Sequence, residues 1–146
     1  MSKSNAFEND LLKHVFNNDA IALVGDATGL RGSTVAGDLY VSLHTADPDE
    51  AGNQATSETA YTNYARVAVA RTSGGWTVSG NTVSNAALVQ FPQCGVTGAT
   101  LTHFGVGTDA SGAGKLLYSG ALSASLAVSS GIQPQFAAGD LDVTED

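Results

Sequence analysis

The sequence predicts an all-β protein, a jelly-roll-like antiparallel β-sandwich of about eight strands with one N-terminal amphipathic helix. Three observations lead to this prediction. Charged residues make up only 14% of the chain, and small or β-branched residues are abundant, which is typical of short strands joined by tight turns. From residue 38 onward, apolar side chains recur at every second position, the period of a half-buried strand. Only the first segment has helical spacing instead.

This N-terminal helix is predicted over residues 5–17, where apolar residues recur three or four positions apart. Asn5 followed by Glu8 resembles a capping box and marks the expected start of the helix. The apolar face has two possible uses: it closes an open side of the chain's own sandwich, or it docks into a groove on another subunit. The candidate partner-binding residues on this face are Phe7, Leu11, Leu12, Val15 and Phe16.

Alternating segments separated by turn residues follow an irregular, glycine-containing connector at residues 21–37. Gly80-Asn81 predicts a two-residue hairpin turn, and Gly120 is expected to interrupt a strand. The predicted organisation is therefore a helix and connector arm at residues 1–37 and a β-sandwich domain at residues 38–146. Strands are expected near residues 39–44, 65–70, 76–78, 83–91, 100–107, 115–119, 122–128, 132–136 and 141–143.

The charge balance disfavours two classes of partner. The formal net charge is −8, and the six lysines and arginines are scattered, so no stripe of positive charge is available for nucleic acid or an anionic membrane. No apolar run approaches the ~20 residues of a membrane-spanning helix. The polar N-terminus leads us to expect a protein made in the cytoplasm, and the single Cys94 is expected to be a packed apolar side chain.

The polar loop after the first predicted strand is a candidate calcium site. Counted from Asp47, the residues Asp49, Gly52 and Glu58 fall at positions three, six and twelve of an EF-hand-like loop. Ala51 occupies the fifth position, where an oxygen ligand belongs, and the flanking segments read as strands. A solvated polar loop is the alternative reading, and Asp47, Asp49 and Glu58 are the candidate ligands.

Other motifs give no convincing active site. The glycines at 112 and 114 resemble a phosphate loop, but Leu116 stands where a hydroxyl should bind magnesium. The three histidines are far apart in the sequence and no nucleophile elbow is present, so we expect no catalytic residue and no cofactor. Aromatic side chains on strands could stack on sugars but are more often packed in a core. These aromatic residues are Tyr40, Tyr61, Tyr64, Trp76 and Tyr118.

Several segments of the chain resemble a family of small virion proteins of tailed bacteriophages. The resemblance covers residues 38–143 and lies in structural rather than catalytic motifs. The segments that carry it are DLYVSLHTADP at 38–48, YARVAV at 64–69, GWTV at 75–78, THFGVG at 102–107 and GKLLYSGAL at 114–122.

This resemblance implies a structural role in a phage particle. It implies a capsid cement (decoration) protein that stabilises the icosahedral head by bridging subunits of the major capsid protein, as a homodimer or other homo-oligomer. A receptor- or glycan-binding module on a tail or head fibre is the alternative. Either role implies a virion protein that is assembled in the host cytoplasm, and the acidic charge agrees with a subunit that stays soluble before docking.

Overall fold

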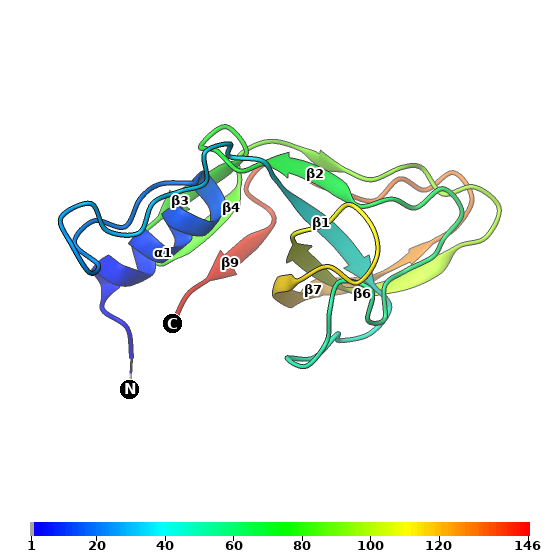
Figure 1. Ribbon diagram of the computed structural model, residues 1–146. Helices are drawn as coiled ribbons and strands as arrows, with labels where there is room; N and C mark the ends of the chain where they lie inside the picture. Colours follow the sequence, from blue (N-terminus) through cyan, green and yellow to red (C-terminus); the bar gives the residue numbers. More distant parts are fainter. Residues whose placement is uncertain (1) are drawn as a thin grey trace. The chain divides into compact units, whose positions relative to one another are not determined.

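The computed structural model describes residues 2–146, which form one helix and short antiparallel strands (Figure 1). The prediction of a mostly β protein with one N-terminal helix is confirmed, and an all-β sandwich fits the structure. The elements are α1 (Asn5–Asn17), β1 (Asp38–His44), β2 (Val67–Ala70), β3 (Trp76–Ser79), β4 (Thr82–Asn85), β5 (Val89–Gln90), β6 (Ala99–Gly107), β7 (Leu116–Val128), β8 (Gln135–Phe136) and β9 (Asp142–Thr144).

The strands of the described residues form three sheets, with orders β2-β1-β6-β7, β3-β4-β9 and β5-β8. The chain divides into two compact units. Unit 1 comprises Met1–Asp38, Val69–Leu88 and Phe136–Asp146, and unit 2 comprises Leu39–Ala68 and Val89–Gln135. Helix α1 therefore shares a unit with later strands, whereas the predicted division at residue 38 separates it from them. That division stays a prediction.

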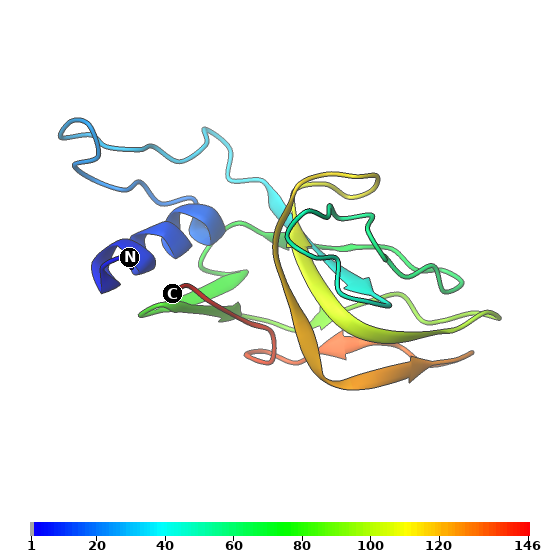
Figure 2. The ribbon, with the colours of Figure 1, turned by 90° about the horizontal axis from the view of Figure 1, so that it is seen from below.

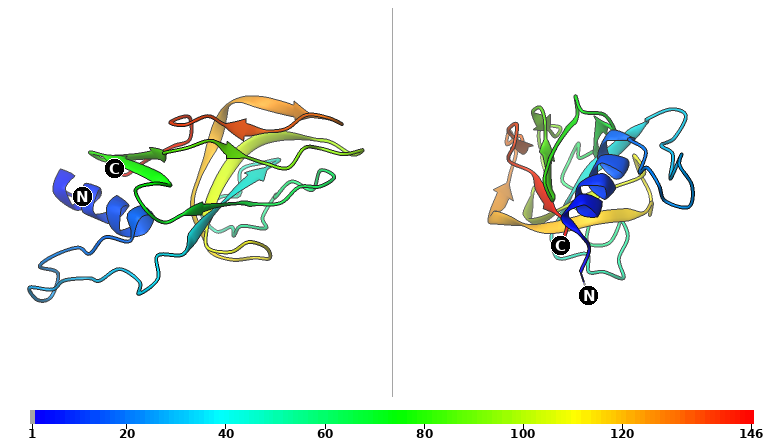
Figure 3. Two further views of the ribbon diagram at one scale, coloured as in Figure 1. Left: turned by 90° about the horizontal axis from the view of Figure 1, so that it is seen from above. Right: turned by 90° about the vertical axis from the view of Figure 1, so that its left-hand side faces the viewer.

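In unit 1, α1 packs against the sheet β3-β4-β9 (Figure 3). Leu12 and Phe16 lie one turn apart on the helix and are fully buried. The ring of Phe16 meets Trp76 of β3 edge-on, with centroids 4.9 Å apart and planes at 65°, a geometry worth about 0.5–1.5 kcal/mol beyond burial alone. The turn at Gly80-Asn81 joins β3 to β4 as predicted, with Gly80 at a φ of 61°.

The helix begins one residue earlier than the capping box suggested. Ser4 is the N-cap, with an extended backbone, and its hydroxyl accepts a hydrogen bond from the N–H of Phe7. Asn5 already belongs to the helix, so the prediction of Asn5 as the cap is wrong. Serine and asparagine are similarly good caps, and the sequence offered both side by side. At the other end, Asn18 adopts the left-handed conformation that terminates a helix.

Arg71 fixes the C-terminal end of α1. Its guanidinium donates to the carbonyl oxygens of His14 and Val15, at 2.6 and 2.5 Å, which the helix leaves without intrahelical partners. The same group donates to Ser33 Oγ and to the carbonyl oxygen of Ala36 in the connector. One arginine thus ties the helix end to the segment that leads into β1.

The connector itself is irregular, as predicted, but it is anchored at its base. The side chain of Asn18 pairs with the backbone of Ser33 through two hydrogen bonds, and a single β-bridge joins Ile21 to Leu30. At its tip, Leu23 has a φ of 68° and is 78% exposed.

Unit 2 contains the central strands β1 and β6, which pair in antiparallel register. The prediction of a half-buried β1 is wrong, because both faces of this strand are covered. Leu39, Val41 and Leu43 lie in the apolar core, and Ser42 and His44 on the other face are fully buried as well. The side chains on that second face are covered by the long loop that follows β1.

Strand β7 runs without interruption past Gly120, contrary to the sequence expectation. Gly120 pairs with Phe104 of β6, and an added Cβ would lie 2.9 Å from the ring. The glycine therefore makes room for an aromatic ring instead of ending the strand. A register shift between Leu101 and His103 coincides with a sharp bend of β7 in Figure 2. Across residues 2–146, no helix is long and apolar enough to cross a membrane.

Candidate functional site

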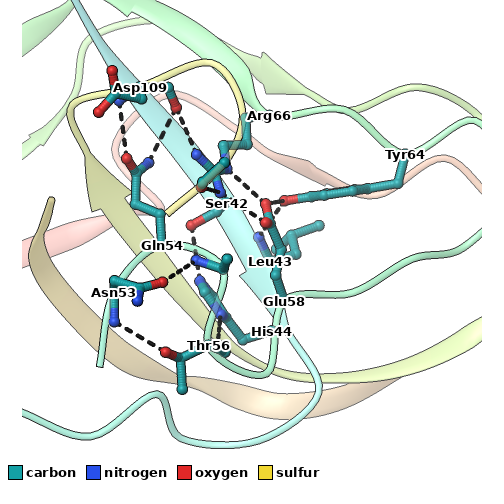
Figure 4. A network of polar contacts seen from close by, with 12 residues as sticks. Ser42, Leu43, His44, Asn53, Gln54, Thr56, Glu58, Tyr64, Arg66 and Asp109 are labelled. Carbon is teal, nitrogen blue, oxygen red and sulfur yellow. Dashed lines mark hydrogen bonds and ion pairs between the residues drawn. The ribbon is translucent and has the colours of Figure 1, made fainter. Parts of the chain in front are cut away.

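The candidate site is a pair of loops in unit 2 that a buried polar network holds together (Figure 4). The first loop comprises residues 45–66, between β1 and β2, and the second comprises residues 108–115, between β6 and β7. We call these two segments the clamped loops. Backbone polar groups in loops need partners when they are covered. In these loops, three buried side chains supply the partners.

His44 attaches the first loop to the face of β1. Its Nε2 lies 2.8 Å from Ser42 Oγ, and its Nδ1 lies 2.8 Å from the carbonyl oxygen of Thr56. Because a carbonyl only accepts, Nδ1 carries the hydrogen and Nε2 accepts from the serine hydroxyl. Burial lowers the pKa of His44, so the neutral ring is the form that this site holds. Ser42 and His44 are fully buried, which leaves no path for a substrate to the hydroxyl in this conformation.

Arg66 connects the two loops. Its Nε and Nη2 donate to the two carboxylate oxygens of Glu58, at 2.7 and 2.8 Å. Its Nη1 and Nη2 also donate to the carbonyl oxygens of Asp109 and Gly112, at 2.8 and 2.6 Å. The hydrogen bonds that Arg66 donates to the Glu58 carboxylate are the largest cause of the raised pKa of Arg66. A bidentate pair of this kind fixes orientation as well as charge.

Tyr64 extends this network to the backbone of β1. Its hydroxyl donates to Glu58 Oε1 at 2.8 Å and accepts from the N–H of Leu43 at 3.1 Å. Burial raises the pKa of Tyr64, so the phenol stays protonated and keeps its donor role. The carboxylate of Glu58 is thus bound by an arginine and a tyrosine at once.

Gln54 makes a second, uncharged connection between the loops. Its side-chain amide donates to the carbonyl oxygen of Asp109 and accepts from the backbone N–H of the same residue. The backbone N–H of Gln54 donates to the carbonyl oxygen of Ala113. Gly107 and Gly114 leave the space that this fully buried side chain occupies. A Cβ at either position would lie 2.2 or 2.1 Å from the Gln54 amide. A side chain at either position would therefore displace the Gln54 amide.

Two cavities border the clamped loops. One, of 590 Å³, lies between the acidic start of the first loop and β7 residues 116–121. The other, of 570 Å³, lies between residues 58–66 and residues 110–112. Both volumes fall in the range of clefts that hold small molecules or short peptide segments.

The structure does not assemble the calcium candidates. Glu58, the proposed twelfth ligand, is engaged by Arg66 and Tyr64, and Asp47 Oδ1 accepts from the backbone N–H of Asp49. Among residues 2–146, no group of three or more His, Cys, Asp or Glu side chains is placed to hold a metal ion. Glu58 already serves as the partner of Arg66, which its spacing in the sequence did not reveal, so the structure does not favour the calcium site, which stays a prediction.

The helix residues proposed for partner binding divide into two groups. Leu12 and Phe16 are fully buried in unit 1 and cannot reach a partner in this conformation. Phe7 is 40% exposed, and Leu11 and Val15 are partly buried. For these three, partner binding stays a prediction.

The sequence reasoning missed Arg66 and Gln54 as site residues. A signal for Arg66 was available, since an arginine within an alternating apolar stretch of a chain with few basic residues is expected to be paired. Gln54 carried no such signal, because its role depends on two distant glycines.

Comparison with known proteins then supplies the family. No curated protein matches the chain. One protein-family model, described as podophage GP4 fiber I protein gp80, matches residues 2–144. This match spans the helix, both units and both clamped loops. The chain belongs to this podophage fibre protein family and is a structural protein of a bacteriophage virion.

Proposed function

We propose that this chain is a subunit of a virion fibre, where its clamped loops form part of a contact surface. The observation that carries the proposal is the match to a fibre protein family over residues 2–144. The resemblance in the sequence had favoured a capsid cement protein first and a fibre module second. The family match favours the fibre.

The clamped loops support this function. Arg66 and Gln54 join the two loops through hydrogen bonds, and ordering a loop before binding removes an entropic cost from recognition. Loops held on a rigid sheet are the usual carriers of binding function. We also propose that the chain has no catalytic role, since its one hydrogen-bonded Ser–His pair among the described residues is fully buried.

The cement role remains the competing candidate. That role implied bridging of major capsid subunits, with the N-terminal helix as one possible docking element. Leu12 and Phe16 are used in the chain's own core, so this argument for cement is weaker than the sequence suggested. A homo-oligomeric state fits either role and is part of the proposal.

Position and copy number in the particle separate the two candidates. Purified virions would be labelled with gold-conjugated antibody against the chain, and its copies counted by quantitative mass spectrometry relative to the major capsid protein. A fibre subunit is expected in tens of copies, with gold confined to fibres. Hundreds of copies with gold spread over the head would overturn the fibre proposal and establish the cement role.

A further inference from the structure

The connector between α1 and β1 exposes several large apolar side chains. Nine such side chains are exposed among the described residues, and four of the nine belong to this one connector. They are Leu23, Val24, Leu30 and Val35, with exposed fractions between 44% and 78%. Single exposed apolar side chains are normal on a protein surface, whereas a concentration of them in one place indicates a site of interaction.

The tip of the connector is ordered by its own hydrogen bonds. Ile21 and Leu30 exchange two backbone hydrogen bonds, of 2.8 and 2.9 Å. Between them, the carboxylate of Asp26 accepts from the N–H and the hydroxyl of Thr28 and from the N–H of Gly29. Figures 2 and 3 show the connector looping away from α1. The apolar side chains at the tip are therefore presented by an ordered turn and not by a loose chain.

The connector is also the formally neutral part of an acidic chain. Residues 21–37 contain one acidic residue, Asp26, and one basic residue, Arg31, so the net charge of −8 lies outside them. Two copies of the chain repel each other where their acidic surfaces face one another. This repulsion is weakest where connector meets connector. The charge distribution therefore favours a second copy of this chain as the molecule that covers the connector.

We propose that the connector is a contact between two copies of this chain, in which Leu23 and Val24 of one copy pack against the connector of the other. Burial of the apolar side chains drives association, and a turn that is ordered beforehand lowers the entropy cost of binding. A contact between identical surfaces closes about a twofold axis, which gives a dimer.

This inference deepens the proposed fibre function, because it names a contact between subunits, and it rests on that function only for its place in the particle. The two can fail separately. Gold labelling of virions tests the fibre location, whereas the oligomeric state of the purified chain tests the contact.

The test is sedimentation velocity of the full-length chain between about 1 and 100 μM. We expect a dimer whose Kd rises at least about tenfold in the variant Leu23→Asn/Val24→Ser. Asparagine suits the left-handed backbone at Leu23, where φ is 68°, so this variant removes the apolar groups and keeps the turn. The matched control Leu88→Asn/Val96→Ser removes the same two types of side chain from other exposed positions and should change the Kd less than about twofold.

Salt and hydrogen exchange test the chemistry of the contact. Because the contact is apolar and the chain is acidic, salt at about 0.5 M screens the repulsion and should leave the dimer as tight or make it tighter. Hydrogen exchange should show protection of residues 21–30 that is lost on dilution. A monomeric wild-type chain, a dimer that weakens in salt, unchanged exchange on dilution, or equal effects of the two double variants would overturn the proposal. So would a monomer that binds a different virion protein through Leu23 and Val24, because the occupant would then be another chain.

Discussion

Arg66 and Arg71 both bind backbone carbonyl oxygens of long connections, but they differ in burial and in whether a counterion pairs with them. Arg66 in unit 2 and Arg71 in unit 1 both hold a long connection by donating to backbone carbonyl oxygens. Arg66 is buried and neutralised by the bidentate Glu58, whereas Arg71 is partly exposed and bonds to carbonyl and hydroxyl oxygens. A buried guanidinium needs a counterion to offset the cost of its burial, whereas neutral oxygens are sufficient partners for a guanidinium that water can still reach.

The largest expected effect comes from Arg66→Met. It removes the partner of a carboxylate whose side chain is only 17% exposed, and breaking a buried pair in this way costs about 3–5 kcal/mol. Urea unfolding followed by circular dichroism measures the loss of free energy of unfolding. The double variant Arg66→Met/Glu58→Gln should recover part of it. A double variant no more stable than Arg66→Met would show that the stranded charge is not the cause.

Gly107→Ala tests the uncharged connection of the same loops. The new Cβ would lie 2.2 Å from Gln54 Cδ, so Gln54 must leave its site and lose its bonds to Asp109. We expect a loss of about 1–3 kcal/mol, the usual cost of overpacking. Gly112→Ala serves as a control for the loop, because nothing lies within 4 Å of its Cβ and only its positive φ opposes the change. Equal losses for the two variants would argue against a role for Gln54.

Arg71→Met should cost less than Arg66→Met, about 1–2 kcal/mol, since it leaves unsatisfied carbonyl oxygens but no buried charge. Hydrogen exchange should show faster opening at the C-terminal turn of α1 and across residues 33–37, with unit 2 unchanged. A loss as large as that of Arg66→Met would remove the distinction between the two arginines.

The smallest effect is a pH dependence due to His44. Its pKa in the folded chain lies below the ordinary value of 6.5, so the unfolded chain binds the proton more readily. The stability from this residue is present above pH 6.5 and decreases as the pH falls toward the folded-state pKa, by at most about 1.4 kcal/mol per pH unit. His44→Gln should flatten this slope between pH 5 and 7. An unchanged slope in His44→Gln would assign the effect to other groups.

The sequence was informative where a local pattern determines structure. The helical period of residues 5–17, the two-residue turn at Gly80-Asn81 and the alternation of β1 all correspond to observed elements. Alternation shows which side chains share a face but not what covers that face. The burial of Ser42 and His44 under a loop therefore could not be predicted.

The polar network that joins the clamped loops could not be predicted for a related reason. The hydrogen bonds between the two loops join residues more than forty positions apart, such as Arg66 to Asp109 and Gln54 to Asp109, and no local spacing encodes them. Gly120 misled the strand assignment because a glycine that admits an aromatic ring looks the same in sequence as a glycine that ends a strand.

The interleaving of the two units has a consequence for the order of folding. Unit 2 is built from residues between 39 and 135, whereas unit 1 needs both α1 and β9, which are separated by more than a hundred residues. Val83 of β4 pairs with Val143 only after β9 has been synthesised. On the ribosome, unit 2 can therefore close first, while β4 lacks its partner strand β9 until the end of synthesis. A nascent chain that stalls before residue 142 would leave this edge of β4 unpaired and become a target for chaperones or proteases.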